Sequence, residues 1–103
     1  MEKEGTVATS TPTRDDRTYQ DAEGVSIHYY VWKARKPRAV IQIAHGLGEY
    51  ATRYGWLAGK LTAEGYTVYA DDHRGHGQTG LGQYGGDHTK LGKLGPGGMR
   101  ATV

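Results

Sequence analysis

The stretch that decides the fold is Ala39-Val-Ile-Gln-Ile-Ala-His-Gly-Leu-Gly-Glu49, a nearly continuous apolar run that ends abruptly in a glycine-containing loop. Apolar runs of this length are typical of strands buried on both faces of a parallel sheet. Helical spacing of apolar residues then predicts a helix from Thr52 to Glu64, and residues 66–70 form a second apolar run. Strand, loop, helix and strand make one βαβ unit, which predicts a parallel strand pair and an α/β fold.

Upstream of this unit the sequence predicts an antiparallel hairpin. Residues 25–32 alternate and are rich in β-branched and aromatic side chains, and a short strand over residues 17–20 precedes a turn at 21–24. Residues 1–16 are polar and are interpreted as a disordered arm. The expected domain therefore covers residues 17–103.

Downstream of Asp71 the chain is dominated by glycine. The density of glycine over residues 75–98 predicts no regular helix there, because glycine is a poor helix former. After Pro96, the four-residue spacing of Met99 and Val103 predicts the first turn of a further helix.

Composition excludes several classes of protein. The 103 residues contain no cysteine, so neither a disulfide framework nor a thiolate metal site is expected. There is no run of 18 apolar residues and no secretory signal pattern at the N-terminus, which favours a cytoplasmic location without a transmembrane segment. Leu, Ile and Val are few, so the eight Tyr and two Trp must supply much of the core.

Three sequence patterns could indicate a ligand: a basic cluster, a glycine-rich match to a dinucleotide-binding motif, and a pair of histidines. The basic cluster at residues 33–38 is too short for nucleic-acid recognition and reads as a solvated loop. The G-x-G-x-x-G match at residues 75–80 does not follow a strand directly, so no dinucleotide cofactor is expected. His73 and His76, flanked by glycine-rich loops, leave open an alternative function as a small anion- or metal-binding module.

Two motifs together carry a family resemblance. His45-Gly-Leu-Gly-Glu49 follows the first predicted strand of the βαβ unit, and Asp72-His-Arg-Gly-His-Gly77 follows the second. With the intervening helix, this pattern resembles the N-terminal part of the α/β-hydrolase fold, in the monoglyceride lipase and lysophospholipase branch. The resemblance covers about residues 17–103. It implies a serine hydrolase that acts on carboxylic esters such as monoacylglycerols or lysophospholipids and uses no cofactor.

The resemblance also assigns roles to the two loops. His45, Gly46, Leu47 and Gly48 would form the oxyanion-hole loop, with the Leu47 N–H as a donor. The residues of the second motif would brace the pocket without joining the catalytic triad. These structural-loop residues are Asp72, Arg74, Gly75, His76 and Gly77.

No catalytic nucleophile is recognisable in the sequence. The only serines are Ser10 and Ser26, and neither lies in the G-x-S-x-G motif that the family requires. The nucleophile, acid and catalytic histidine are expected beyond Val103, so the chain alone is expected to be inactive. In this fold, strand 39–44 would then lie at an open sheet edge, which predicts self-association through that strand.

Overall fold

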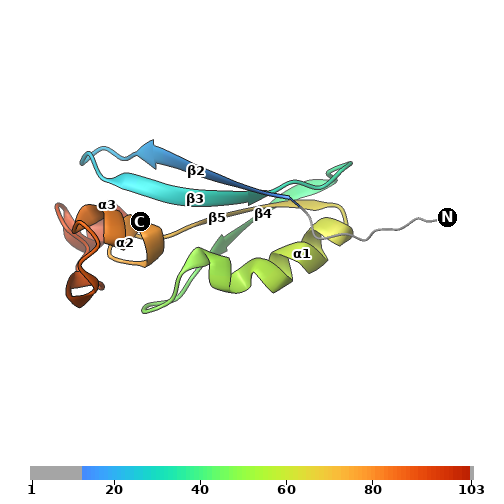
Figure 1. Cartoon of the computed structure of the whole chain (residues 1–103). Helices are drawn as coiled ribbons and strands as arrows, with labels where there is room; N and C mark the ends of the chain where they lie inside the picture. The colour runs from blue at the N-terminus through green and yellow to red at the C-terminus, as the bar shows by residue number, and fades with distance from the viewer. Residues whose placement is uncertain (1–12, 103) are drawn as a thin grey trace.

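A computed structural model describes residues 13–102 and has a four-stranded mixed sheet at its centre (Figure 1). The strands are β2 (Arg14–Gln20), β3 (Ser26–Trp32), β4 (Ala39–Ala44) and β5 (Tyr66–Asp71), and their order in the sheet is β2-β3-β5-β4. β4 and β5 pair in parallel, as the βαβ prediction requires, whereas β3 pairs antiparallel with both β2 and β5. The predicted α/β architecture is therefore confirmed.

The N-terminal boundary differs from the prediction. β2 begins at Arg14 rather than Arg17, and Arg14 pairs with Trp32 at the far end of the hairpin. Residues 14–16 therefore belong to the sheet and not to a disordered arm, because they pair with residues 30–32 of β3. The Arg14–Asp16 and Arg17–Asp15 ion pairs lie along this exposed strand. The rest of the expected arm, residues 1–12, lies outside the described residues.

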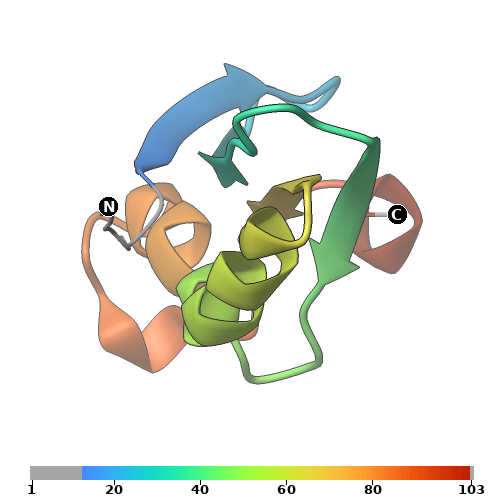
Figure 2. The ribbon, with the colours of Figure 1, turned by 90° about the vertical axis from the view of Figure 1, so that its right-hand side faces the viewer.

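The crossover from β4 to β5 contains two helical segments instead of one. The 3₁₀ helix η1 (Ala51–Tyr54) leads into α1 (Gly55–Ala63), which packs against β5 on one face of the sheet. Figure 2 shows the sheet curving over α1. The buried core between them is built from both small and aromatic side chains, as the scarcity of aliphatic residues predicted: Tyr30, Trp32, Ala51, Ala58, Val68 and Ala70.

β4 is far more exposed than its apolar sequence predicted. Among the described residues its one neighbour in the sheet is β5, so its other edge is open. Ile43 packs against the core, but the side chain of Val40 is 63% exposed. The expectation of a strand buried on both faces is wrong for the described residues, because no element among residues 13–102 covers the Val40 face. The predicted position of this strand at an edge of the sheet is what the described residues show.

The glycine-rich segment contains a helix that propensity argued against. α2 (Gly77–Gln83) follows β5, then η2 (His88–Lys90), and α3 (Gly98–Thr102) matches the turn predicted near Met99. α2 forms because tertiary contacts override propensity: Thr79 is fully buried and its hydroxyl oxygen accepts a hydrogen bond from the backbone N–H of His28 at 2.8 Å.

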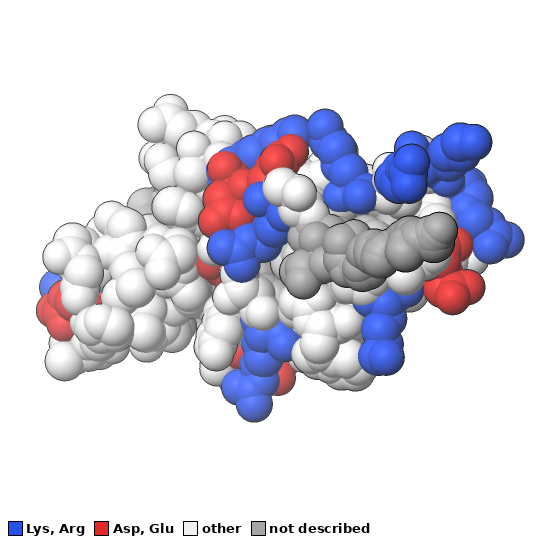
Figure 3. Space-filling model, turned by 45° about the vertical axis from the view of Figure 1, so that its right-hand side comes forward, with Lys and Arg blue, Asp and Glu red and all other residues white. Residues whose placement is uncertain are grey.

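The basic cluster at residues 33–38 lies away from the carboxyl ends of the parallel strands. The exposed basic residues Lys33, Arg35, Lys36 and Arg38 lie in the loop that enters β4 at its amino end. Figure 3 shows Lys and Arg side chains gathered toward one end of the surface. Within residues 13–102, no helix has both the length and the apolar character needed to cross a bilayer.

Candidate functional site

The two motif loops lie side by side at the carboxyl ends of β4 and β5. The parallel register pairs Ala44 with Asp71, so the loops that leave the two strands start from adjacent positions. The structure thus brings together His45–Gly48 and Asp72–Gly77, which are 24 or more residues apart in sequence. In open α/β sheets this edge is where ligands bind.

Glu49 organises the loop after β4. Its Oε1 accepts hydrogen bonds from the Gly46 N–H at 2.9 Å and from the Tyr54 hydroxyl at 2.5 Å. These hydrogen bonds, first that of Tyr54 and then that of Gly46, hold the pKa of Glu49 below its ordinary value. The Glu49 N–H in turn donates to the Gly46 carbonyl at 3.1 Å, which closes the loop as a tight turn. Gly48 has a φ of 79°, a left-handed conformation that favours glycine.

The Leu47 amide stands out within this turn. The N–H groups of Gly46, Gly48 and Glu49 all donate to acceptors in the protein, Gly48 to the His76 imidazole at 3.0 Å. No acceptor for the Leu47 N–H is found among residues 13–102. The Leu47 side chain is 87% exposed. The turn therefore presents one amide N–H without an acceptor among the described residues, and we call this an open donor. The neighbouring N–H groups are all hydrogen-bonded, or engaged.

Asp72 joins three elements from a position that is only 1% exposed. Its carboxylate accepts hydrogen bonds from the Tyr30 hydroxyl of β3 at 2.7 Å, the Ala51 N–H of η1 at 2.7 Å and the Gln78 N–H of α2 at 2.9 Å. Burial, together with this hydrogen bond to a carboxylate, raises the pKa of Tyr30 well above its ordinary value. A buried carboxylate with three donors is satisfied and therefore fixes the β3, η1 and α2 segments relative to one another.

Gly77 allows α2 to approach this carboxylate. A Cβ at position 77 would lie 2.4 Å from Asp72 Cγ, and its φ of 52° is left-handed. Both the space and the backbone conformation require glycine here. The second motif therefore needs Gly77 to bring the first turn of α2 against Asp72.

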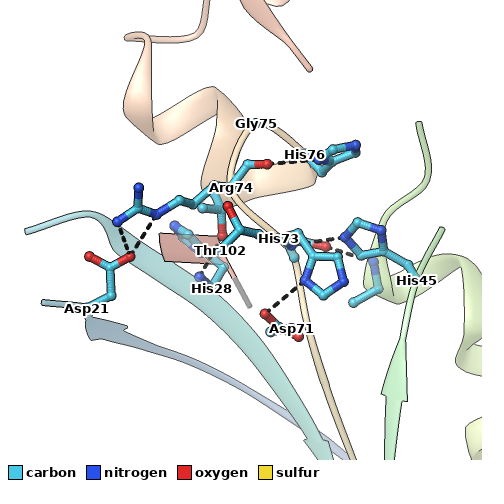
Figure 4. A network of polar contacts seen from close by, with 12 residues as sticks. Asp21, His28, His45, Asp71, His73, Arg74, Gly75, His76 and Thr102 are labelled. Atoms are coloured by element: carbon cyan, nitrogen blue, oxygen red, sulfur yellow. Dashed lines mark hydrogen bonds and ion pairs between the residues drawn. The ribbon is translucent and has the colours of Figure 1, made fainter. Parts of the chain in front are cut away.

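Arg74 pairs with a carboxylate that the sequence did not suggest. Its Nε and Nη2 lie 2.8 and 2.7 Å from Asp21 Oδ2 in the β2–β3 turn (Figure 4), and its Nη1 contacts the Pro96 carbonyl. Burial disfavours the ionised form of Asp21, but hydrogen bonds from Arg74 and from the turn's backbone outweigh it and lower the pKa. This Asp–Arg pair ties the loop after β5 to the hairpin turn.

The histidines do not form a metal site. Both ring nitrogens of His76 are used, Nδ1 by the Arg74 carbonyl at 2.8 Å and Nε2 by the Gly48 N–H. His73 Nδ1 faces Asp71 at 3.2 Å. No cluster of three potential ligands occurs in the part of the chain that the structure describes. Nothing supports the alternative of a small metal- or anion-binding module.

Two clefts border the loops, of about 780 and 680 Å³, and Leu47 and His76 line both. The larger cleft has apolar side chains from Leu47, Leu81 and Leu91. Glycine and apolar side chains around an open N–H are suited to an acyl group whose carbonyl oxygen needs a donor.

Several residues of this site were not expected from the sequence. Tyr30, Tyr54 and Asp21 each complete a hydrogen-bonded group whose other member is a motif residue. Asp21 was recognisable only as a turn residue, and the two tyrosines only as apolar bulk. Tyr30 and Asp21 meet their partners through contacts between elements distant in sequence, for which a single sequence offers no signal. Tyr54 lies only five residues from Glu49, but their hydrogen bond depends on the turn between them.

Comparison with known proteins agrees with this geometry. The family model described as serine aminopeptidase, S33 matches residues 35–93. The monoacylglycerol lipase of Mycolicibacterium smegmatis is 45% identical over 69 residues, covering 66% of this chain and 25% of the relative. The human monoglyceride lipase is 38% identical over 71 residues, covering 68% and 23%. Similar in structure is a thermostable carboxyl esterase from Bacillus coagulans in complex with glycerol, with a TM-score of 0.72 and 31% identity, covering 86% of this chain and 28% of the esterase.

The chain therefore spans about a quarter of the length of the relatives it matches. The match includes both motif loops and the crossover between them, since all lie within residues 35–93. This chain belongs to the serine aminopeptidase S33 family of α/β-hydrolase-fold proteins.

Proposed function

We propose that this chain contributes the oxyanion-hole loop of a serine hydrolase that cleaves carboxylic esters, with monoacylglycerols or lysophospholipids as substrates. The observation that carries the proposal is the open Leu47 N–H between the engaged amides of Gly46 and Gly48. Ester hydrolysis passes through a tetrahedral intermediate whose oxygen carries negative charge. A fixed amide donor aimed at that oxygen contributes about 3–4 kcal/mol to catalysis.

The roles of the remaining residues follow from this assignment. Glu49 and His76 hold the amides on either side of Leu47, and Gly48 supplies the left-handed turn that exposes it. Asp72, Gly75 and Gly77 line the larger cleft, and Arg74 ties their loop to Asp21 in the β2–β3 turn. The apolar side chains of that cleft would receive the acyl chain. The names of the related lipases and of the glycerol-bound esterase favour a glycerol ester over other carboxylic esters.

The complete reaction needs groups that these 103 residues do not contain. A serine nucleophile would attack the ester carbonyl, a histidine would take its proton, and the acyl-enzyme would be hydrolysed by water without a cofactor. Ser26 lies exposed in β3, away from any strand-to-helix turn. We therefore expect the chain alone to show no turnover of p-nitrophenyl esters and no labelling by a fluorophosphonate probe.

The proposal is tested in a chimera. Residues 35–93 would replace the corresponding segment of the Mycolicibacterium monoacylglycerol lipase, and monoacylglycerol hydrolysis would be measured. We expect an active chimera in which Leu47→Pro, which deletes the N–H, lowers kcat by about 10²–10³-fold. Leu47→Ala is the matched control and should retain most of the activity, because the donor belongs to the backbone. Equal losses from proline and alanine would rule out the amide as the donor.

The open edge of β4 also supports a proposal about self-association. Its unpaired backbone groups and the exposed Val40 are the features by which an edge strand pairs with another chain. We expect the isolated chain to associate through β4 at micromolar concentration. Sedimentation together with hydrogen exchange tests this: a monomer in which residues 40–43 are strongly protected would contradict it.

A further inference from the structure

His45 and His76 make the same kind of hydrogen bond in opposite directions between the two loops. The backbone N–H of His73, in the loop after β5, donates to His45 Nε2 at 2.9 Å. The backbone N–H of Gly48, in the loop after β4, donates to His76 Nε2 at 3.0 Å. Each loop thus supplies one imidazole acceptor and one amide donor, and Figure 4 shows the His45 ring lying beside the segment that carries His73 and His76.

The second nitrogen of each ring determines its protonation. Nδ1 of His45 lies 2.8 Å from the Gly46 carbonyl oxygen, and Nδ1 of His76 lies 2.8 Å from the Arg74 carbonyl oxygen. A carbonyl oxygen can only accept and an amide N–H can only donate. Both rings must therefore carry their proton on Nδ1 and keep Nε2 unprotonated, so both are neutral.

The surroundings of His45 oppose a charge on its ring. His45 and His76 are each 6% exposed, and the centroid of the His45 ring lies 4.0 Å from that of His73 and 5.0 Å from that of His76. Burial, and then the neighbouring His73 and His76, lower the pKa of His45, although its hydrogen bond to Gly46 and the charge of Asp72 act in the other direction. A proton on either Nε2 would also point at an amide N–H.

We propose that His45 and His76 are paired positioning residues, which as neutral imidazoles fasten the loop after β4 to the loop after β5 and hold the Leu47 turn in place. A proton on either Nε2 would remove the acceptor of that hydrogen bond and loosen this turn. The protonation states and the loop contacts stand without the proposed function. Only the consequence for catalysis rests on it.

Other titratable and charged groups line the clefts beside this pair and bear on its pH dependence. They come from β2, the β2–β3 turn, β3, β5, the loops after β4 and β5, and η2. These groups are Tyr19, Asp21, Tyr30, Glu49, Tyr50, Asp71, Asp72, His73, Arg74 and His88. Asp21 is paired with Arg74, and Asp72 is shared by Tyr30 and two backbone amides, so their charges are already engaged.

The first test is long-range ¹H–¹⁵N NMR of the histidine side chains in the 103-residue chain. At neutral pH we expect His45 and His76 both to be protonated on Nδ1. On acidification, the amide signals of His73 and Gly48 should shift in step with the imidazoles that they contact. An Nε2-protonated form of either ring at neutral pH, or amides that do not follow, would overturn the proposal.

Glutamine variants separate the two halves of the pair. A glutamine oxygen can accept a hydrogen bond near the position of Nε2 but does not titrate. We expect His76→Gln to abolish the acid-induced shift of the Gly48 amide and leave that of the His73 amide, and His45→Gln to do the reverse. His88→Gln is the matched control, because His88 is an exposed histidine of η2 that hydrogen-bonds to neither ring, and this variant should leave both shifts in place.

The catalytic consequence is measured in the chimera at pH 8. His76→Leu should lower kcat about tenfold while KM changes less than twofold, and His76→Gln should restore most of the loss. A merely structural role would instead lower the amount of folded enzyme and leave kcat per folded molecule unchanged, which would overturn the catalytic part. An inactive parent chimera would count against the proposed function, whereas the NMR test would still decide whether the imidazole pair exists.

Discussion

The loop after β5 and the strand β4 invert the usual relation between hydropathy and burial. Asp72 and Arg74 of this loop are each 1% exposed, and Thr79 of the following helix α2 is fully buried, whereas Val40 in the most apolar strand is 63% exposed. Asp72 and Arg74 can be buried because each has a polar partner: the Tyr30 hydroxyl donates a hydrogen bond to Asp72, and the Asp21 carboxylate pairs with Arg74. The strand is exposed because no described element lies over its outer face. Whether these side chains are buried therefore depends on the presence of a polar partner or of a covering element, and not on side-chain polarity alone.

The largest expected effect comes from removing Asp72. In Asp72→Ala the Tyr30 hydroxyl and the N–H groups of Ala51 and Gln78 lose their acceptor. Unsatisfied buried donors cost about 1–3 kcal/mol each, so we expect the free energy of unfolding to fall by about 3 kcal/mol or more. Urea unfolding measures this. Asp72→Asn keeps the size of the side chain and one acceptor oxygen, so it should lower the free energy of unfolding by less than Asp72→Ala does. A loss below about 1 kcal/mol in Asp72→Ala would mean that the loop after β5 is not what holds β3, η1 and α2 together.

Gly77→Ala should cost about 2–3 kcal/mol, because the new methyl group would collide with the Asp72 carboxylate and the backbone is left-handed. Gly85→Ala is the matched control. Gly85 also has a positive φ, of 61°, but nothing lies within 4 Å of its Cβ position. It should therefore show only the conformational strain, about 1 kcal/mol. Equal losses in the two variants would show that the close approach to Asp72 contributes nothing.

Lowering the pH should reduce the free energy of unfolding in two steps. The pKa of His45 is lowered in the folded protein from the ordinary 6.5, so the unfolded chain binds more protons and stability is lost as pH falls below about 6.5. The lowered pKa values of Asp21 and Glu49 add a second loss below their ordinary values of 3.8 and 4.5. Urea midpoints at successive pH values should resolve both steps. In His45→Gln the first step should shrink; an unchanged first step would assign it to another group.

The smallest expected effect on stability belongs to the exposed strand. Val40→Lys should change the free energy of unfolding by no more than about 0.5 kcal/mol, since the side chain is already in water. It should nevertheless reduce self-association, because a lysine on an edge strand hinders pairing. Sedimentation at several concentrations measures this. Val68→Ala, at a fully buried valine of the adjacent strand, should cost about 2 kcal/mol. If Val40→Lys were as costly, the outer face of β4 would be covered after all.

Local sequence patterns determined the βαβ unit, the hairpin and the two motif loops. The apolar run at residues 39–44, the helical spacing that follows and the run at 66–70 appear in the structure as β4, η1 with α1, and β5. These elements could be read because each depends on side-chain periodicity within about ten residues. The adjacency of the motif loops also followed, since parallel neighbouring strands end at the same edge of a sheet.

Tertiary structure alone decided the helix over Gly77–Gln83, the partners of the charged groups and the hydrogen-bond partners of His45 and His76. Glycine disfavours a helix locally, but the Asp72 carboxylate receives the Gln78 N–H and buried Thr79 receives the His28 amide. Asp21 and Arg74 are 53 residues apart, and His45 and His76 meet only because β4 and β5 pair in parallel. The free energy of these contacts depends on distance in space, and the order of residues in one chain does not encode that distance directly.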